Sequence, residues 1–179
     1  SPQVGSLLGQ MTFASTASIS LAFRREEVAH PLDGSGFLAP RTEACPITAC
    51  TWTSSKWLGR ATEGRVLLRA FMGWAGDGSS LEMDDPEMVR LTMEALRPLL
   101  GLRGDPDQTW VHRWPQAMPQ YRVGHQAWLD SLESAWSLTP GLFFAGASYG
   151  GVGIPDCIRQ AKEAAQRVRH LVSQRVLRA

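Results

Sequence analysis

The sequence predicts an α+β fold, in which antiparallel strands with helices are followed by the closing βα unit of an α/β domain. Four strand-like segments follow one another between residues 11 and 74 with no helical pattern between them, as in an antiparallel sheet. The chain ends on a strand-like run, a glycine-rich turn and a long helical pattern. This order is typical of a βα unit.

The first half of the chain supplies the predicted sheet and one helix. Strand-like patterns occupy 11–23, 47–55 and 65–74, and the short segment 30–40 contains a tight turn at Asp33-Gly34. A helix is predicted from the acidic loop at 75–87 to about residue 100, where glycine ends it. Acidic side chains at a helix start complement its dipole, so we assign no catalytic role to this cluster.

The second half begins with a short strand at 109–114, which Pro115 and Pro119 should break. A helix is predicted over 124–136, then a strand over 142–147, the glycine turn and the final helix. The final helix has an apolar stripe, and six basic residues and one acid follow from residue 159 onward. We interpret this surface as a solvated face, with a peripheral membrane contact as the alternative.

Composition excludes several classes of function. A net charge of +1 gives no field that would favour nucleic acid, and no run approaches the roughly 20 apolar residues that span a bilayer. The three cysteines form no CxxC, which predicts reduced thiols in a cytoplasmic protein and no metal site. The seven tryptophans are interpreted as core anchors, with a site for a flat aromatic ligand as the alternative.

The glycine turn, GASYGGVG at 146–153, can bring backbone close to a ligand. The helix after it directs free N–H groups and a positive dipole end toward the turn, which suits an anion or the electron-rich edge of a cofactor. A purely steric role for the glycines stays open. The turn contains no GxGxxG and the chain no phosphate-binding GxxxxGK[ST], so nothing here would hold the rest of a nucleotide.

Three segments of the chain carry motifs that go beyond general sequence patterns. The segment GLFFAGASYGGVGIPDCIRQAKEAA at 141–165 resembles the C-terminal signature of the FAD-dependent protoporphyrinogen and coproporphyrinogen III oxidase family, within the flavin amine oxidase-like superfamily. The segment RWPQAMPQYRVGH at 113–125 resembles its W-x-x-x-x-P-Q-Y-x-x-G-H motif, and GSGFLAP at 34–40 its G-x-G-x-L-x-P turn. The strands at 51–74 match those that follow. The wording IPDCI is closest to the bacterial branch that oxidises coproporphyrinogen III.

The resemblance implies that the chain is the C-terminal part of such an enzyme. Residues 1–110 would be the C-terminal part of the substrate-binding domain, and residues 111–179 that of a Rossmann-like FAD-binding domain. The implied reaction, in haem biosynthesis, is three successive two-electron oxidations of a porphyrinogen, with FAD as hydride acceptor and oxygen as oxidant. The implied partners are the porphyrinogen and the missing N-terminal half. An uncovered apolar face also predicts self-association into a homo-oligomer.

The resemblance also implies the residues that bind the cofactor. Val152, Gly153 and Ile154 would place backbone against the isoalloxazine and ribityl part of FAD. Trp114 would lie at the flavin, whereas without the resemblance it would be interpreted as a core tryptophan.

Gly36 and Leu38 would border the substrate cavity, where the missing side chain of Gly36 leaves room for a tetrapyrrole face. No catalytic side chain is expected, because the family's proton and hydride losses are attributed to flavin and oxygen chemistry. His125 is therefore interpreted as a cap of the helix that begins beside it. The alternatives are another flavin amine oxidase-like enzyme, such as an amine oxidase or carotenoid desaturase, and a non-catalytic fragment that cannot hold FAD alone.

Overall fold

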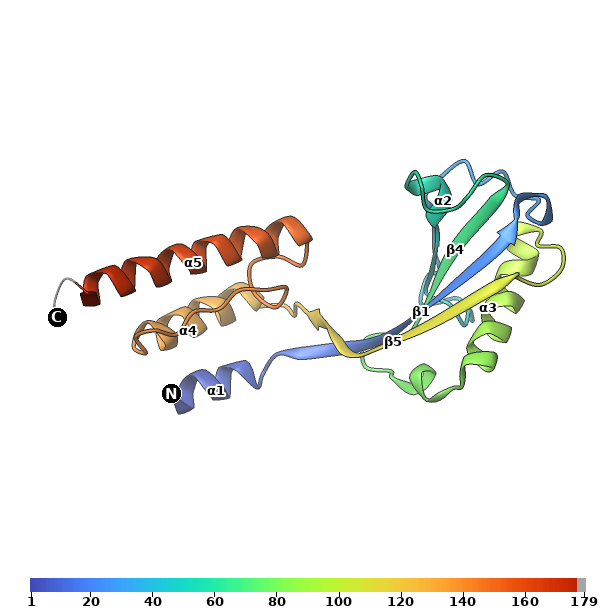
Figure 1. Ribbon diagram of the computed structural model, residues 1–179. Helices are drawn as coiled ribbons and strands as arrows, with labels where there is room; N and C mark the ends of the chain where they lie inside the picture. The colour runs from blue at the N-terminus through green and yellow to red at the C-terminus, as the bar shows by residue number, and fades with distance from the viewer. Residues whose placement is uncertain (177–179) are drawn as a thin grey trace. The chain divides into compact units, whose positions relative to one another are not determined.

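The computed structural model describes residues 1–176 of the chain and divides it into two compact units. One unit is Ala14–Met118, and the other combines Ser1–Phe13 with Pro119–Ala179 (Figure 1). The boundary predicted at residue 110 lies inside the first of these units. The strand β5, Gln108–Gln120, continues past residue 110 and stays paired in the sheet, while the first residues belong with the C-terminal helices.

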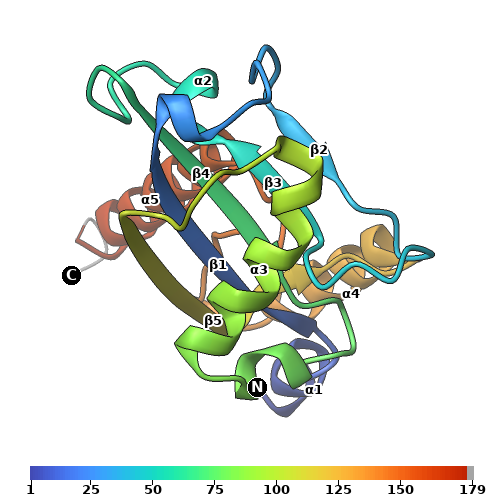
Figure 2. The same ribbon diagram turned by 90° about the vertical axis from the view of Figure 1, so that its right-hand side faces the viewer.

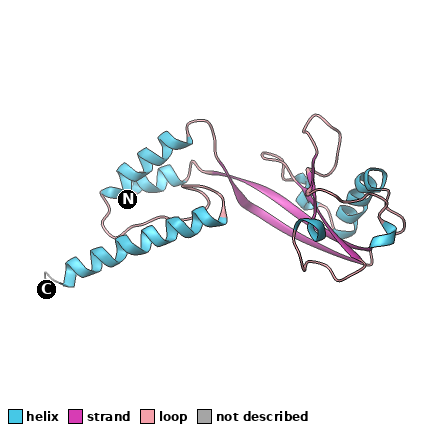
Figure 3. Cartoon of the chain, turned by 90° about the horizontal axis from the view of Figure 1, so that it is seen from above, coloured by secondary structure: helices cyan, strands magenta, loops and turns pink. Residues whose placement is uncertain are grey.

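The unit Ala14–Met118 is built on a five-stranded sheet with the order β2-β3-β4-β1-β5. The pairs β2–β3, β3–β4 and β4–β1 are antiparallel, as the succession of strand patterns predicts. Figure 3 shows these strands in magenta. Their bounds are β1 Thr12–Arg24, β2 Gly36–Leu38, β3 Ala49–Trp52, β4 Arg65–Met72 and β5 Gln108–Gln120.

The helix α3, Asp85–Leu100, covers one face of this sheet (Figure 2). Its start is capped by Asp84, whose carboxylate accepts a hydrogen bond from the Glu87 N–H at 2.8 Å, and its end is the left-handed Gly101. The acidic cluster thus serves the helix start, as interpreted from the sequence. The largest fully buried side chains of this core are Phe23, Ile19, Leu21, Ile47, Leu68, Met72, Met88 and Leu96.

Three short elements complete this unit. They are the 3₁₀ helices Arg25–Glu27 (η1) and Ser79–Glu82 (η2) and the single-turn helix α2, Thr53–Lys56. The strand predicted over 47–55 is correspondingly shorter, because the chain turns into α2 after Trp52.

The second unit is helical. It contains α1 (Pro2–Leu8), α4 (His125–Ser137) and α5 (Ile154–Val176). Val4 of α1 and Leu132 of α4 are buried together, and the Trp128 indole N–H donates to the Leu7 carbonyl at 2.9 Å. The sequence analysis predicted α4 and α5 but not α1.

Two predictions about strands are wrong: the break of a strand at Pro115 and Pro119, and the strand over 142–147. The strand at 109–114 does not break at Pro115 or Pro119, because β5 is the edge strand of the sheet and an edge position leaves one row of N–H groups without a partner strand. Residues 142–147 form no strand, since no strand in the described part of the chain lies beside them to supply hydrogen bonds. The predicted closing βα unit is therefore present here only as its turn and helix.

In the described residues, no helix combines the length and the apolar character that crossing a bilayer requires.

Candidate functional site

The sheet face opposite α3 carries polar and small side chains together with Leu38 and Phe71, arranged in rows. Strand alternation places residues that pair across the sheet on the same face. The pairing register therefore assigns this open face two neighbouring rows. One row is Gly36, Thr51, Arg69 and Ser20, and the next is Leu38, Ala49, Phe71 and Ser18.

The second row reaches the edge strand β5. The Trp114 indole N–H lies 3.5 Å from the Ser18 hydroxyl, and the Trp114 side chain is half-exposed. The structure thus places three predicted site residues, Gly36, Leu38 and Trp114, on one face. It does not bring them into contact, because β2 and β5 are the two edges of the sheet and lie about 19 Å apart at the usual strand spacing.

A groove of about 540 Å³ occupies the β4–β1–β5 part of this face. Trp110, His112 and Trp114 of β5 form an aromatic wall, and Ser18 and Ser20 of β1 provide a floor without bulk. Three arginines also line it: Arg60, Arg65 and Arg69. Large aromatic surface beside small residues and cations suits a flat, acidic ligand. The sequence contained these residues, but only the strand register places them together.

One of the groove arginines, Arg65, is neutralised, because it forms an ion pair with Asp107. Arg41, by contrast, lies over the Trp74 ring, 5.5 Å from its centroid, and is not among the groove residues. Of the cations that could serve an acidic substrate, Arg60 and Arg69 therefore remain.

Gly36 is glycine for a reason of local folding. Its φ of 135° is a conformation that L-residues rarely adopt, and a Cβ would lie 2.1 Å from the Cys50 carbonyl oxygen. A side chain at this position would collide with the neighbouring strand β3. Room for a substrate is thus not needed to explain this glycine.

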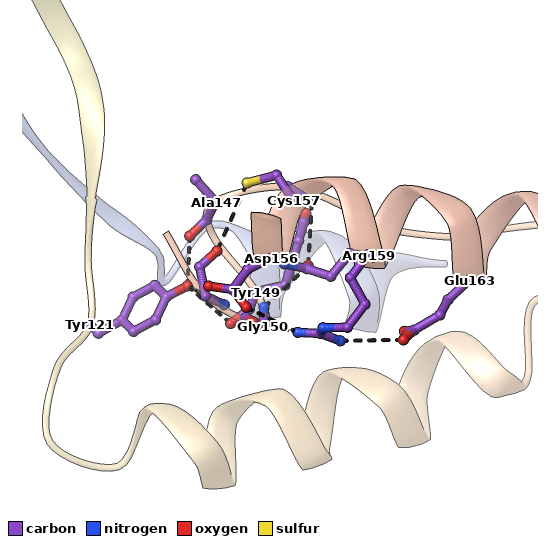
Figure 4. Close-up of polar contacts among 11 residues, drawn as sticks. Tyr121, Ala147, Tyr149, Gly150, Asp156, Cys157, Arg159 and Glu163 are labelled. Atoms are coloured by element: carbon purple, nitrogen blue, oxygen red, sulfur yellow. Dashed lines mark hydrogen bonds and ion pairs between the residues drawn. The ribbon is translucent and has the colours of Figure 1, made fainter. Parts of the chain in front are cut away.

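In the second unit, the glycine turn is held by Tyr121 (Figure 4). The Tyr121 hydroxyl lies 2.6 Å from the Ala147 carbonyl and 3.1 Å from the Tyr149 carbonyl, and it accepts from the Gly151 N–H at 3.1 Å. The ring of Tyr121 stacks on His125 with centroids 3.8 Å apart. One hydroxyl thus connects three backbone groups of the turn.

Gln160 of α5 also holds the glycine turn. Its side chain is buried, and its Oε1 accepts from the N–H groups of Gly150 and Gly146 at 3.2 and 3.4 Å. Asp156 lies under the next part of the turn. A Cβ on Gly151, whose φ is 124°, would lie 2.6 Å from the Asp156 carboxylate. The glycine allows backbone to approach this side chain closely.

The predicted cofactor residues follow at the start of α5. Within the described residues, no protein acceptor is found for the N–H groups of Val152, Gly153 and Ile154. Val152 is 63% and Ile154 77% exposed. Free N–H groups at the positive end of a 23-residue helix fit the N1–C2=O edge of a flavin, where negative charge collects on reduction. These residues would hold that edge through backbone only.

The interpretation of His125 as a helix cap is wrong. The N-cap of α4 is Gly124, with φ of 87°, and no side chain caps this helix. The His125 Nε2 instead lies 3.2 Å from the Tyr149 carbonyl, so the imidazole, like Tyr121, holds the glycine turn. Both residues lie in the PQY-x-x-G-H segment. The turn that they hold follows about 25 residues later, so the spacing of the sequence could not reveal these contacts.

No group of three or more potential metal-ligating side chains occurs in the portion of the chain that the structure describes.

Comparison with known proteins gives a consistent result. The family model described as flavin containing amine oxidoreductase matches residues 2–169. Coproporphyrinogen III oxidase of Bacillus subtilis is 42% identical over 158 residues, which cover 88% of this chain and 34% of that protein. The chloroplastic protoporphyrinogen oxidase 1 of Arabidopsis thaliana is 30% identical, over 97% of this chain and 34% of its own length. The chain thus spans about a third of the curated relatives it matches.

Solved structures agree with the fold. A putative protoporphyrinogen oxidase from Exiguobacterium has a TM-score of 0.78 and 30% identity, and the match covers 93% of this chain and 36% of that one. A reduced UDP-galactopyranose mutase, at 14% identity and a TM-score of 0.66, shares the fold alone. The resemblance to porphyrinogen oxidases and the flavin cofactor predicted from the sequence are confirmed by these matches. The chain belongs to the flavin containing amine oxidoreductase family.

Proposed function

We propose that this chain is the C-terminal part of a flavin-dependent porphyrinogen oxidase that converts coproporphyrinogen III to coproporphyrin III. The observation that carries the proposal is the 42% identity, over 88% of the chain, to a protein named coproporphyrinogen III oxidase. The groove on the open sheet face supports it independently, since its aromatic wall and arginines suit a flat macrocycle with carboxylate side chains.

In this proposal the two units have separate roles. Ala14–Met118 contributes the substrate-binding surface, with Gly36 and Leu38 on the edge strand β2 and Trp114, the proposed flavin contact, on the edge strand β5. The unit with Pro119–Ala179 contributes the glycine turn, where the free N–H groups of Val152, Gly153 and Ile154 would hold the edge of the flavin.

When bound, the FAD supplies hydride acceptance and reaction with oxygen. The chain's own residues position and shield. Tyr121, His125 and Gln160 fix the turn so that its donors are oriented before charge develops, which lowers the reorganisation that reduction would otherwise require. Trp110 and Trp114 offer ring faces that can hold a macrocycle and exclude water. No side chain of this chain is assigned a proton transfer.

The N-terminal part of the enzyme is the proposed partner of the second unit. Within the strand-like run 142–147, the backbone of residues 143–145 makes no hydrogen bond with the described part of the chain, and α5 exposes Ile158, Val168 and Val172. A strand and a sheet surface supplied by an FAD-binding half would cover both. The same apolar side chains, interspersed with arginines, are those that a second copy or a membrane surface would contact in the absence of that half. The assembled enzyme is proposed to be cytoplasmic.

A second candidate function is that of another flavin amine oxidase-like enzyme, which the family assignment also allows. A third is a non-catalytic fragment, favoured for the isolated chain because the described residues include no Rossmann sheet.

The test is turnover by this chain assembled with the N-terminal part and FAD. Coproporphyrinogen III, protoporphyrinogen IX and a primary amine are supplied in turn, and porphyrin fluorescence and peroxide are measured. We expect porphyrin from coproporphyrinogen III at the highest kcat/KM. Peroxide from the amine without porphyrin from either macrocycle would favour the second candidate, and the isolated chain serves as the control for the third.

A further inference from the structure

Arg69 lies in the middle of the open sheet face. The register places it between Thr51 of β3 and Ser20 of β1, in the same row as Gly36. Both direct neighbours are short, so the arginine is the only long side chain of that row. Its position in the groove makes the guanidinium available to anything that lies flat against the sheet.

The charge of Arg69 is not neutralised by the protein. Among the described residues, no hydrogen bond or ion pair of its guanidinium is found. Nine ion pairs do occur among those residues, and all of them are formed by six other arginines: two each by Arg24, Arg90 and Arg159, and one each by Arg65, Arg97 and Arg113. Within the groove lining, the one carboxylate is Asp107, and it is paired with Arg65.

Arg113 of the same sheet differs from Arg69, because its guanidinium is bound by other parts of the protein. Arg113, on the opposite face of β5, donates to the Leu81 and Met83 carbonyls and pairs with Asp85 at the start of α3. Every direction of its guanidinium is used to hold the loop before α3. Arg69 has none of these partners, so its charge contributes no such contact to the fold.

We propose that Arg69 binds a carboxylate of the substrate, and that this contact makes the groove selective for the free acid of a macrocycle over its ester. The inference rests on the proposed function and names a residue for it. A guanidinium presents two parallel N–H groups to a carboxylate, which gives orientation as well as attraction. With the ring against Trp110 and Trp114, a propionate that extends across the floor of Ser18 and Ser20 meets Arg69.

The test uses the enzyme assembled with its N-terminal part and loaded with FAD. Binding of coproporphyrin III and of its tetramethyl ester is measured by fluorescence in the same detergent, for the wild type and for Arg69→Met. Loss of a partly solvated arginine–carboxylate contact weakens binding by about tenfold, which corresponds to about 1.4 kcal/mol. We expect this loss for the acid, a change of less than about twofold for the ester, and partial recovery of acid binding in Arg69→Lys.

The matched control is Arg90→Met, which removes the same charge from the exposed side of α3, where Arg90 pairs with Glu87 and Glu94. It should bind both ligands as the wild type does. Equal acid binding by Arg69→Met and wild type, in enzymes with equal flavin content, overturns the assignment of Arg69 alone. A wild type that binds neither macrocycle and forms no porphyrin overturns the proposed function together with it.

Discussion

The Tyr121 hydroxyl is the single group whose removal should most selectively loosen the glycine turn. Tyr121→Phe keeps the ring that stacks on His125 and deletes only the oxygen that contacts three backbone groups. A hydroxyl donates one proton and here accepts one, so two hydrogen bonds are lost at about 1 kcal/mol each. Tyr121 is 41% exposed, which lets water replace part of this, and we expect a net loss of about 1–2 kcal/mol.

This loss should appear as weaker flavin binding, because the turn carries the N–H groups of Val152 to Ile154. A loss of 1–2 kcal/mol corresponds to a Kd for FAD raised by about five- to thirtyfold. The assay is titration of the flavin-free assembled enzyme with FAD, followed by flavin fluorescence. Tyr149→Phe is the control, since no hydrogen bond of the Tyr149 hydroxyl is found in the described residues. If Tyr121→Phe bound FAD as tightly as Tyr149→Phe and wild type, the positioning role of Tyr121 would be refuted.

Two further predictions concern stability and thiol chemistry. Gly36→Ala should lower the free energy of unfolding of the sheet unit by about 3 kcal/mol or more in urea, because strain at positive φ adds to the collision with the Cys50 carbonyl. Gly59→Ala is the control, since Gly59 has φ of 72° and open space around it, and it should lower the free energy of unfolding by only about 1 kcal/mol. Equal effects of the two substitutions would contradict this account. Burial raises the pKa of the Cys50 thiol to about 12. At pH 8.5 an alkylating reagent should therefore modify the half-buried Cys157 in the folded protein but Cys50 only after unfolding, as peptide mass mapping would show. Modification of both thiols at one rate would contradict the burial of Cys50.

Elements with a local cause were predictable from the sequence. Helix α3 has acidic residues at its start, helical apolar spacing and glycine at its end, and it forms with those boundaries. Strands β1 and β4 follow runs of β-tolerant residues. Each of these signals lies within its own segment, so the rest of the chain was not needed to predict these helices and strands.

Elements that depend on neighbours were not predictable in this way. Residues 142–147 have the composition of a strand, yet a strand requires a hydrogen-bonded partner, and the part of the chain that the structure describes places none beside them. The passage of β5 beyond Pro115 follows from its place at the sheet edge, which is a property of the whole sheet. The candidate site divides similarly. The free N–H groups at the start of α5 were expected from the glycine turn, whereas Arg69 could be assigned to the groove only through the pairing of β3, β4 and β1.

The most direct test of the account is whether coproporphyrinogen III reduces the flavin held by this chain and its N-terminal part. The assembled, FAD-loaded enzyme is mixed with coproporphyrinogen III without oxygen, and the visible flavin band is recorded. The account predicts that the band bleaches as the macrocycle is oxidised, and that it returns when oxygen is admitted. A band that stays unchanged with coproporphyrinogen III and with protoporphyrinogen IX, while dithionite bleaches it fully, would contradict the assignment as a porphyrinogen oxidase.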